Sequence, residues 1–379
     1  MHSRHPHLFV DISAHGFGHL GQAAPVLNAL RERLPGLLLT VRSGLPLAAL
    51  QARLHGHFVH RAERSDCGFI MRDATRIDLA ASAEAYRARH HDWASCVDAE
   101  AAFLSALRPD LVLTDVAYLP LAGAAQAGLP ALSMCSLNWA DLFAYFFASE
   151  PWAAEIHQQM LAAYNSAACF LRLTPGMPMP ALSRVRVMPP VATLATHSTH
   201  STRGQDGHAG RSALRAQLGC ATEERLVLIA FGGVQKQLPV ERWAKIPGVR
   251  WLIPQNWGVV RDDMSAIEPL KQTIPDLLCS VDAVLCKPGY GTFTEAACNG
   301  TAVLYLRSED WPEQSFLIDW LQQNARCREV SAGHVDSGEL APALAALWQQ
   351  PPVARPQPTG IAEVADVIAH QLRAGSRSV

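Results

Sequence analysis

Short apolar runs that alternate with segments of helical spacing do most to restrict how this chain can fold. In the first half, helical spacing occurs in segments such as Ala23 to Leu34 and Val97 to Leu107. Strand-like runs lie around these segments at Leu8 to Ala14, Leu37 to Ser43, His57 to Ala62, Asp110 to Val116 and Ala131 to Leu137. Such alternation is typical of βαβ units, so it predicts a parallel sheet covered by helices.

This first series ends with a long helical candidate, Ala140 to Ser166, and a last strand near Phe170 to Leu173. Sequence rich in Pro, Ser, Thr and His follows without periodicity, which predicts an exposed linker. A second alternating series has strand-like runs at Arg225 to Gly233, Val249 to Gln255, Ala283 to Gly289 and Ala302 to Ser308. The segment Ile361 to Leu372 is apolar at helical spacing and can pack on either half.

With 379 residues, the chain is longer than one hydrophobic core usually supports. We therefore expect an α/β fold with two doubly wound, Rossmann-like parallel-sheet domains facing across a cleft, where ligands of such folds bind. The predicted boundaries are an N-terminal domain at 1–185, a linker at 186–212, a C-terminal domain at 213–358, and a C-terminal helix and tail at 359–379.

Composition excludes several classes of protein. Only 17% of residues are charged and the formal net charge is −2, which argues against disorder and against an electrostatic grip on nucleic acid. The nine cysteines have no C-x-x-C spacing, so we expect no disulfide framework, no metal and no cofactor motif. We expect Cys279, Cys286 and Cys298 to be buried small apolar residues in a reducing compartment. No signal-peptide core or apolar run of membrane-spanning length is found, so the prediction is a cytoplasmic protein. Peripheral membrane contact and oligomeric state stay open.

A nonapeptide, KPGYGTFTE at 287–295, joins one strand-like run to a helix-like segment. Thr292 can cap that helix, and the two glycines before it leave backbone N–H groups open to an anion, to which Lys287 adds a positive charge. Glu295, one turn further, can accept hydrogen bonds from a ribose diol. The segment is therefore either a nucleotide site or an ordinary glycine turn followed by a solvated glutamate.

A second glycine-rich loop, SAHGFGH at 13–19, directly follows the first strand. Gly16 and Gly18 permit a tight turn, after which His19 can act as a general base because its ordinary pKa is near 6.5. Asp115 ends the fourth strand-like run, and there it can bind the other ring nitrogen and fix the tautomer. The two residues would form a base and its orienting partner.

Plainer interpretations of this loop stay open. His15 and His19, four residues apart, could be metal ligands, although no third ligand has a recognisable spacing. His19 could equally be a loop histidine without chemistry. Aromatic and amide side chains near the ends of the N-terminal strands could line an acceptor pocket or belong to the core: Tyr118, Asn138, Trp139, Tyr145 and Phe146.

Together the two loops resemble those of glycosyltransferases of the two-domain GT-B class. The nonapeptide is similar to the donor-binding box of nucleotide-sugar-dependent family-one transferases, H-x-G-W-N-S-x-x-E. Gly289 falls on its glycine, Tyr290 on its tryptophan, Gly291 on its asparagine, Thr292 on its diphosphate-binding serine and Glu295 on its ribose-binding glutamate. Lys287 replaces the phosphate-binding histidine.

The resemblance extends beyond this box. Glu313 and Gln314 fall on the acidic residue and glutamine that hold the donor sugar, although alone they could be a solvated helix start. Gly232 and Gly233 are similar to a loop that approaches the donor phosphates, or they form an ordinary turn. The first loop resembles that of the family-one enzymes and the peptidoglycan lipid II transferases, and His19 occupies the position of the histidine that deprotonates the acceptor, with Asp115 as its partner.

A closer similarity, in both loops, is to the glycosyltransferase-like N-terminal region of plant arabinokinases. No sugar-kinase region follows here, so the resemblance does not carry the kinase activity over to this chain. The proline that often stands three residues after the histidine is replaced by Gln22, and Pro25 comes later. Pro favours the first turn of a helix, so the first helix is expected to start near Ala24, leaving His19 on a longer loop. The segment Thr273 to Asp276 shows no readable nucleobase preference.

The resemblance implies an inverting, metal-independent transfer of a sugar from a nucleotide-diphosphate sugar to an acceptor hydroxyl, with His19 as base. The N-terminal domain would bind the acceptor and the C-terminal domain the donor; a UDP-sugar is a family expectation. Two alternatives stay open: a nucleotide-sugar epimerase and a nucleotide-sugar-binding module without turnover. The acceptor, the sugar and the pathway cannot be read from the sequence.

Overall fold

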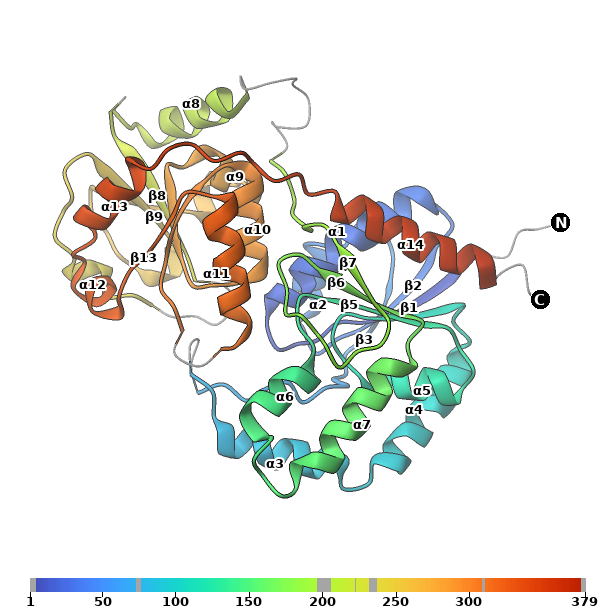
Figure 1. Ribbon diagram of the computed structural model, residues 1–379. Helices are drawn as coiled ribbons and strands as arrows, with labels where there is room; N and C mark the ends of the chain where they lie inside the picture. Colours follow the sequence, from blue (N-terminus) through green and yellow to red (C-terminus); the bar gives the residue numbers. More distant parts are fainter. Residues whose placement is uncertain are drawn as a thin grey trace. The chain divides into compact units, whose positions relative to one another are not determined.

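The computed structural model describes residues 5–72, 76–195, 206–221, 223–231, 237–308 and 311–375. The chain divides into two compact units, which we call unit 1 (Met1–Val191 with Thr359–Val379) and unit 2 (Ala192–Pro358) (Figure 1). The C-terminal segment thus returns to unit 1.

Unit 1 is built on a seven-stranded sheet in the order β3-β2-β1-β4-β5-β6-β7, with every neighbouring pair parallel. Its strands are β1 (His7–Asp11), β2 (Leu38–Arg42), β3 (Val59–Arg61), β4 (Leu111–Thr114), β5 (Ala131–Cys135), β6 (Cys169–Leu173) and β7 (Val185–Met188). The central strands β4 and β5 are buried along their whole length, as expected for a parallel sheet covered on both faces.

The helices of unit 1 fall into two groups. They are α1 (Phe17–Arg33), α2 (Leu47–Gln51), α3 (Leu79–His90), α4 (Trp93–Leu107), α5 (Leu119–Gln126), α6 (Trp139–Phe147), α7 (Ala153–Ser166) and α14 (Gly360–Gly375). Helices α1 and α14 pack against each other, whereas α3 to α7 form a separate layer in which α4 packs on α5, and α7 on α5 and α6 (Figure 1). Unit 1 is therefore a three-layer α/β/α structure.

Unit 2 contains a six-stranded parallel sheet in the order β10-β9-β8-β11-β12-β13. Its strands are β8 (Arg225–Ala230), β9 (Val249–Ile253), β10 (Met264–Ala266), β11 (Ala283–Cys286), β12 (Ala302–Tyr305) and β13 (Cys327–Glu329). Its α-helices are α8 (Asp206–Leu218), α9 (Ile274–Ser280), α10 (Tyr290–Asn299), α11 (Glu313–Asn324), α12 (Ala332–Ser337) and α13 (Ala341–Trp348). Short 3-10 turns are η2 (Val240–Arg242), η3 (Gln255–Trp257) and η4 (Glu268–Leu270).

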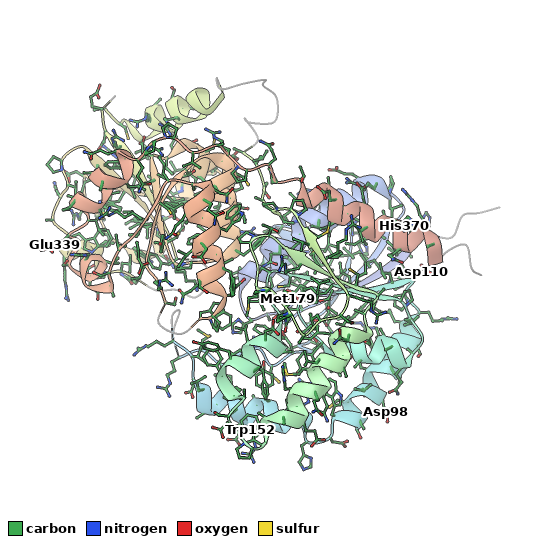
Figure 2. All side chains as sticks on the ribbon, in the orientation of Figure 1. Asp98, Asp110, Trp152, Met179, Glu339 and His370 are labelled. Carbon is green, nitrogen blue, oxygen red and sulfur yellow. The ribbon has the colours of Figure 1, made fainter. Side chains whose placement is uncertain are left out.

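Alternate residues of the unit 2 strands build a core on each face of the sheet. On one face, Val227, Leu285 and Leu304 pack with residues of α12 and α13. Their neighbours in the strands point to the other face, toward the layer in which α9 packs on α10 and α10 on α11. Side chains fill the layers between the sheet and helices of each unit (Figure 2).

The predicted fold class is confirmed, but several boundaries differ. The linker expected at 186–212 overlaps strand β7 at one end and helix α8 at the other. The long helical candidate Ala140 to Ser166 is two helices, because Pro151 cannot continue α6 and lies in the turn before α7. Strands β7, β10 and β13 were not predicted.

Two predicted helix starts are wrong. Helix α1 begins at Phe17, not near Ala24, so Pro25 lies inside it and His19 belongs to its first turn rather than to a loop. Helix α10 begins at Tyr290 with Gly289 as its N-cap, so Thr292 lies within the first turn and does not cap the helix. In both cases the helix starts at the glycine-rich turn itself.

Candidate active site

The order of the unit 1 strands places its candidate residues at a topological switch point. Successive connections leave β1 toward β2 on one side and return to β4 on the other. In open α/β sheets ligands bind at the carboxyl ends of two such strands. Helix α1, which carries His19, follows β1, and Asp115 directly follows β4.

His19 and Asp115 are brought into direct contact there. Nδ1 of His19 lies 2.8 Å from Oδ2 of Asp115, and both side chains are buried. The other carboxylate oxygen, Oδ1, accepts hydrogen bonds from the backbone N–H groups of Ser13 (3.1 Å) and Val116 (2.6 Å). The two amides hold the carboxylate so that its second oxygen faces the imidazole.

The electrostatics of this pair favour a charged imidazole. Burial acts to lower the pKa of His19, but the negative charge and hydrogen bonding of Asp115, together with Cys135, hold that pKa well above 6.5. The sulfur of Cys135 lies 4.0 Å from Nδ1, and burial raises the pKa of this thiol, which keeps it neutral. The contact also directs Nδ1 toward Asp115, so Nε2 is the nitrogen left for proton exchange with a substrate.

Trp139, at the start of α6, packs against both histidines of the first loop. Its ring centroid lies 5.8 Å from that of His19 and 5.1 Å from that of His15. Its Nε1 donates to Oδ2 of Asp66 at 2.9 Å, and its backbone N–H donates to the hydroxyl of Tyr164 at 3.0 Å. Trp139 is completely buried and is therefore a wall of this site, not an exposed acceptor contact.

The irregular segment 62–70 is attached to the same group of residues. Nε2 of His15 lies 2.8 Å from the backbone carbonyl of Phe69, and the hydroxyl of Ser65 donates to Asp11 at 2.7 Å. Gly68 has φ of +55°, and a Cβ there would lie 2.8 Å from the ring of His15. These contacts engage Nε2 of His15 and Nδ1 of His19. Among the described residues, no group of three or more His, Cys, Asp or Glu side chains that could hold a metal ion is found.

In unit 2, the N-terminus of α10 follows β11 at the corresponding switch point. Strand β8 has β9 on one side and β11 on the other, and residues 287–289 connect β11 to α10. Among the described residues, no side chain caps the helix at Gly289. The first-turn N–H groups of Gly291 and Thr292 have no intrahelical acceptor, so they can meet an anion.

Lys287 precedes α10, and Glu295 lies inside that helix, more than one turn after its first residue. Both are half-buried, and burial lowers the pKa of Lys287 below its ordinary value of 10.5. A bound anion would favour its charged form. Tyr290 and Phe293 are buried and fix α10 to the sheet, where Phe293 contacts Tyr305 of β12.

Glu313 and Gln314 begin α11 and are buried. The amide of Gln314 makes a two-way contact with Ser308: its Oε1 accepts from the Ser308 N–H at 2.8 Å and its Nε2 donates to the Ser308 carbonyl at 2.6 Å. Oε2 of Glu313 accepts from Nε1 of Trp311 at 3.0 Å. In this structure both side chains shape the loop between β12 and α11.

Gly232 and Gly233, predicted from the loop after β8, lie outside the described residues. Sequence reasoning missed three residues of this site: Cys135, which contacts His19, Ser13, which donates to Asp115, and Asp66, which accepts from Trp139. Ser13 could have been found, since it belongs to the same loop, but no sequence signal relates segment 62–70 to the histidines.

Similarity to solved structures covers nearly the whole chain. The glycotransferase of kitacinnamycin is 16% identical and matches 98% of this chain and 96% of its own, with a TM-score of 0.61. The calicheamicin glycosyltransferase CalG4 is 13% identical, covers 98% and 95%, and has a TM-score of 0.58. Acinetobacter baumannii MurG is 12% identical, covers 96% and 99%, and has a TM-score of 0.55.

The fold is GT-B. This confirms the predicted resemblance to nucleotide-sugar transferases at the level of fold. In the GT-B fold of this chain, α14 belongs to unit 1 although it follows unit 2 in the sequence.

One curated relative adds a match in sequence. L-arabinokinase of Arabidopsis thaliana is 25% identical over 324 residues, which is 84% of this chain and 30% of that protein. The GT-B chain therefore spans about a third of the relative's length. No family model matches. Within the described ranges, no helix is long and apolar enough to cross a membrane.

Proposed function

We propose that this GT-B chain transfers a sugar from a nucleotide-diphosphate sugar to a hydroxyl acceptor. The observation that carries the proposal is the buried His19–Asp115 pair at the switch point of unit 1, with 2.8 Å between Nδ1 and Oδ2. A protein that only bound a nucleotide sugar would not need a buried imidazole oriented by a carboxylate. GT-B neighbours such as the calicheamicin glycosyltransferase support the same reaction class.

In the proposed reaction, Nε2 of His19 removes the proton of the acceptor hydroxyl while Asp115 stabilises the resulting imidazolium. The acceptor oxygen attacks the anomeric carbon from the side opposite the diphosphate. The bond between that carbon and the diphosphate oxygen breaks, and the nucleoside diphosphate leaves with the electron pair. The configuration at the anomeric carbon is therefore inverted.

Unit 2 would hold the donor. Lys287 and the first-turn amides of α10, at Gly291 and Thr292, face the negative charge that develops on the leaving diphosphate. Glu295 would accept hydrogen bonds from the ribose, and Glu313 with Gln314 would fix the loop against the donor sugar. Because the protein itself supplies this positive charge, we expect transfer to continue in the presence of a metal chelator. The resemblance to family-one transferases makes UDP the expected nucleotide.

A donor screen followed by an acceptor screen tests the proposal. Thermal shift with UDP-, GDP- and dTDP-sugars identifies the donor, and release of free nucleoside diphosphate on addition of hydroxyl acceptors then measures transfer. We expect release that depends on the acceptor and is lost in His19→Ala. Donor binding without release under any acceptor would instead favour the binding module, and a changed sugar without acceptor would favour the epimerase.

A further inference from the structure

Helix α1 begins without the features that usually stabilise a helix start. Its N-cap is Gly16, which makes no side-chain cap bond within the described part of the chain, and no acidic residue lies in its first turn. Gly18 and Gly21 are both within its first two turns, and each costs about 1 kcal/mol relative to alanine in a helix. Contacts with the rest of unit 1 must therefore hold the turn that carries His19.

Gln22 makes one such contact beside the His19–Asp115 pair. It is 3% exposed and lies three residues after His19, hence on the same face of α1. Its Oε1 accepts from the backbone N–H of Ser136 at 3.2 Å, and its Nε2 donates to the Ser136 hydroxyl at 3.1 Å. Because a backbone N–H can only donate, the orientation of the amide is determined.

Ser136 is itself held firmly. It directly follows Cys135 at the end of β5, and its carbonyl accepts from the Met177 N–H at 2.8 Å. Gly176 packs against the same backbone so closely that a Cβ there would lie 2.7 Å from the Ser136 carbonyl oxygen. Gln22 thus joins a helix turn with little stability of its own to a backbone segment that Met177 and Gly176 hold in place.

We propose that Gln22 is a positioning residue that holds the first turns of α1 against the end of β5 and so keeps the His19 imidazole opposite Asp115. The inference rests on the proposed function of His19 as base.

The test is Gln22→Met, which keeps the length of the side chain and removes both hydrogen bonds. NMR titration of labelled histidine, with the His19 signal assigned by its loss in His19→Gln, should show the His19 pKa falling toward 6.5 as Asp115 moves out of contact. Turnover should fall about tenfold to a hundredfold, as expected for a small displacement of a catalytic group, while the KM for the donor is unchanged.

Asn28 offers a matched control on the same helix. Its amide makes a similar two-way clamp, donating to the Arg53 carbonyl at 2.8 Å and accepting from the His55 N–H at 2.9 Å, but it lies nine residues from His19. Asn28→Leu should keep the wild-type His19 pKa and turnover. A folded Gln22→Met with wild-type values, or an equal effect of Asn28→Leu, overturns the proposal.

Ser136→Ala is a second test of the proposal, for the case in which Gln22→Met does not fold. This variant removes only the hydroxyl contact, and it should change the His19 pKa in the same direction by a smaller amount; no change would overturn the proposal. Absence of transfer by the wild type with every donor and acceptor would overturn the proposed function instead, while the histidine titration still decides the role of Gln22.

Discussion

His19 contacts one oxygen of Asp115 while two backbone N–H groups hold the other, so the carboxylate cannot rotate away from the imidazole. In Asp115→Asn, the amide oxygen can keep the backbone contacts, but an NH₂ group then faces Nδ1. The imidazole would carry its proton on Nε2 and could not accept one from a substrate. We expect turnover to fall about a hundred- to ten-thousandfold, with donor affinity unchanged, in an assay of nucleotide release.

Asp66→Asn is the control for this change, because Asp66 accepts from Trp139 and an asparagine oxygen can do the same. It should keep most of the activity. Wild-type turnover in Asp115→Asn would remove Asp115 from the mechanism.

The pH dependence of the reaction follows from the raised pKa of His19. The base must be neutral, so kcat/KM should rise as the pH increases through the His19 pKa, above 6.5, and level off beyond it. Asp115→Asn should move this inflection to lower pH. A flat profile across that range would contradict the assignment.

The raised pKa of His19 also implies that the free energy of unfolding depends on pH. A histidine whose pKa is raised by folding stabilises the folded state most below its unfolded pKa, near 6.5, and that contribution is lost as the pH rises through the folded pKa. The difference in unfolding free energy between wild type and His19→Gln should therefore shrink with rising pH. Urea denaturation on both sides of the folded pKa measures it.

Sequence reasoning succeeded where the local pattern alone identifies a strand and the residues that follow it. The buried strands β1, β4 and β11 were found because they are nearly continuous apolar runs, and the residues placed after them, such as His19 and Asp115, were found because carboxyl ends of parallel strands share one edge. Strands β10 and β13 were missed because they are three-residue edge strands with few buried residues.

Tertiary contacts explain what could not be predicted. Pro25 normally marks a first turn, but α1 begins eight residues earlier because Gln22 and His19 bind partners more than 90 residues away in sequence. Likewise, no periodicity could reveal that segment 62–70 reaches His15 and Trp139.

A buried cluster of three charged residues makes the stability of unit 1 sensitive to substitution. Arg42 binds both oxygens of Glu100 at 2.8 Å and 2.7 Å and also contacts Asp11. All three side chains are buried, so Glu100→Ala leaves a guanidinium short of its partners. We expect it to lower the free energy of unfolding by about 3–5 kcal/mol in urea denaturation.

Glu224→Ala is the comparison for the loss of stability in Glu100→Ala. Glu224 binds Arg250 at 3.1 Å and 3.2 Å in the same two-point manner, but the two side chains are 17% and 18% exposed. Glu224→Ala should therefore cost less than Glu100→Ala. Equal losses would show that burial is not what makes the Arg42 pair important.

Donor binding can be divided between Lys287, which precedes α10, and Glu295, which lies in the middle of that helix. Lys287→Ala should weaken both UDP and inorganic pyrophosphate about tenfold to a hundredfold, the usual range for a hydrogen bond to a charged group. Glu295→Gln should weaken UDP but not pyrophosphate, because its proposed partner is the ribose. Calorimetry measures both. Loss of affinity for the sugar portion alone in Lys287→Ala would contradict the diphosphate role.

Gly291 allows the space in front of α10 to be tested without disturbing the fold. It is the second residue of the helix, and an added Cβ would meet no described atom within 4 Å. Gly333 is the second residue of α12 and is equally open, its closest described neighbour lying 4.0 Å away.

Alanine at either position should stabilise the protein by about 0.4–1 kcal/mol, because it reduces the freedom of the unfolded chain. Only Gly291→Ala should also change the affinity for UDP, since Gly291 lies in the proposed diphosphate-binding turn and Gly333 does not. If both variants bind UDP as the wild type does, the phosphate lies elsewhere in unit 2.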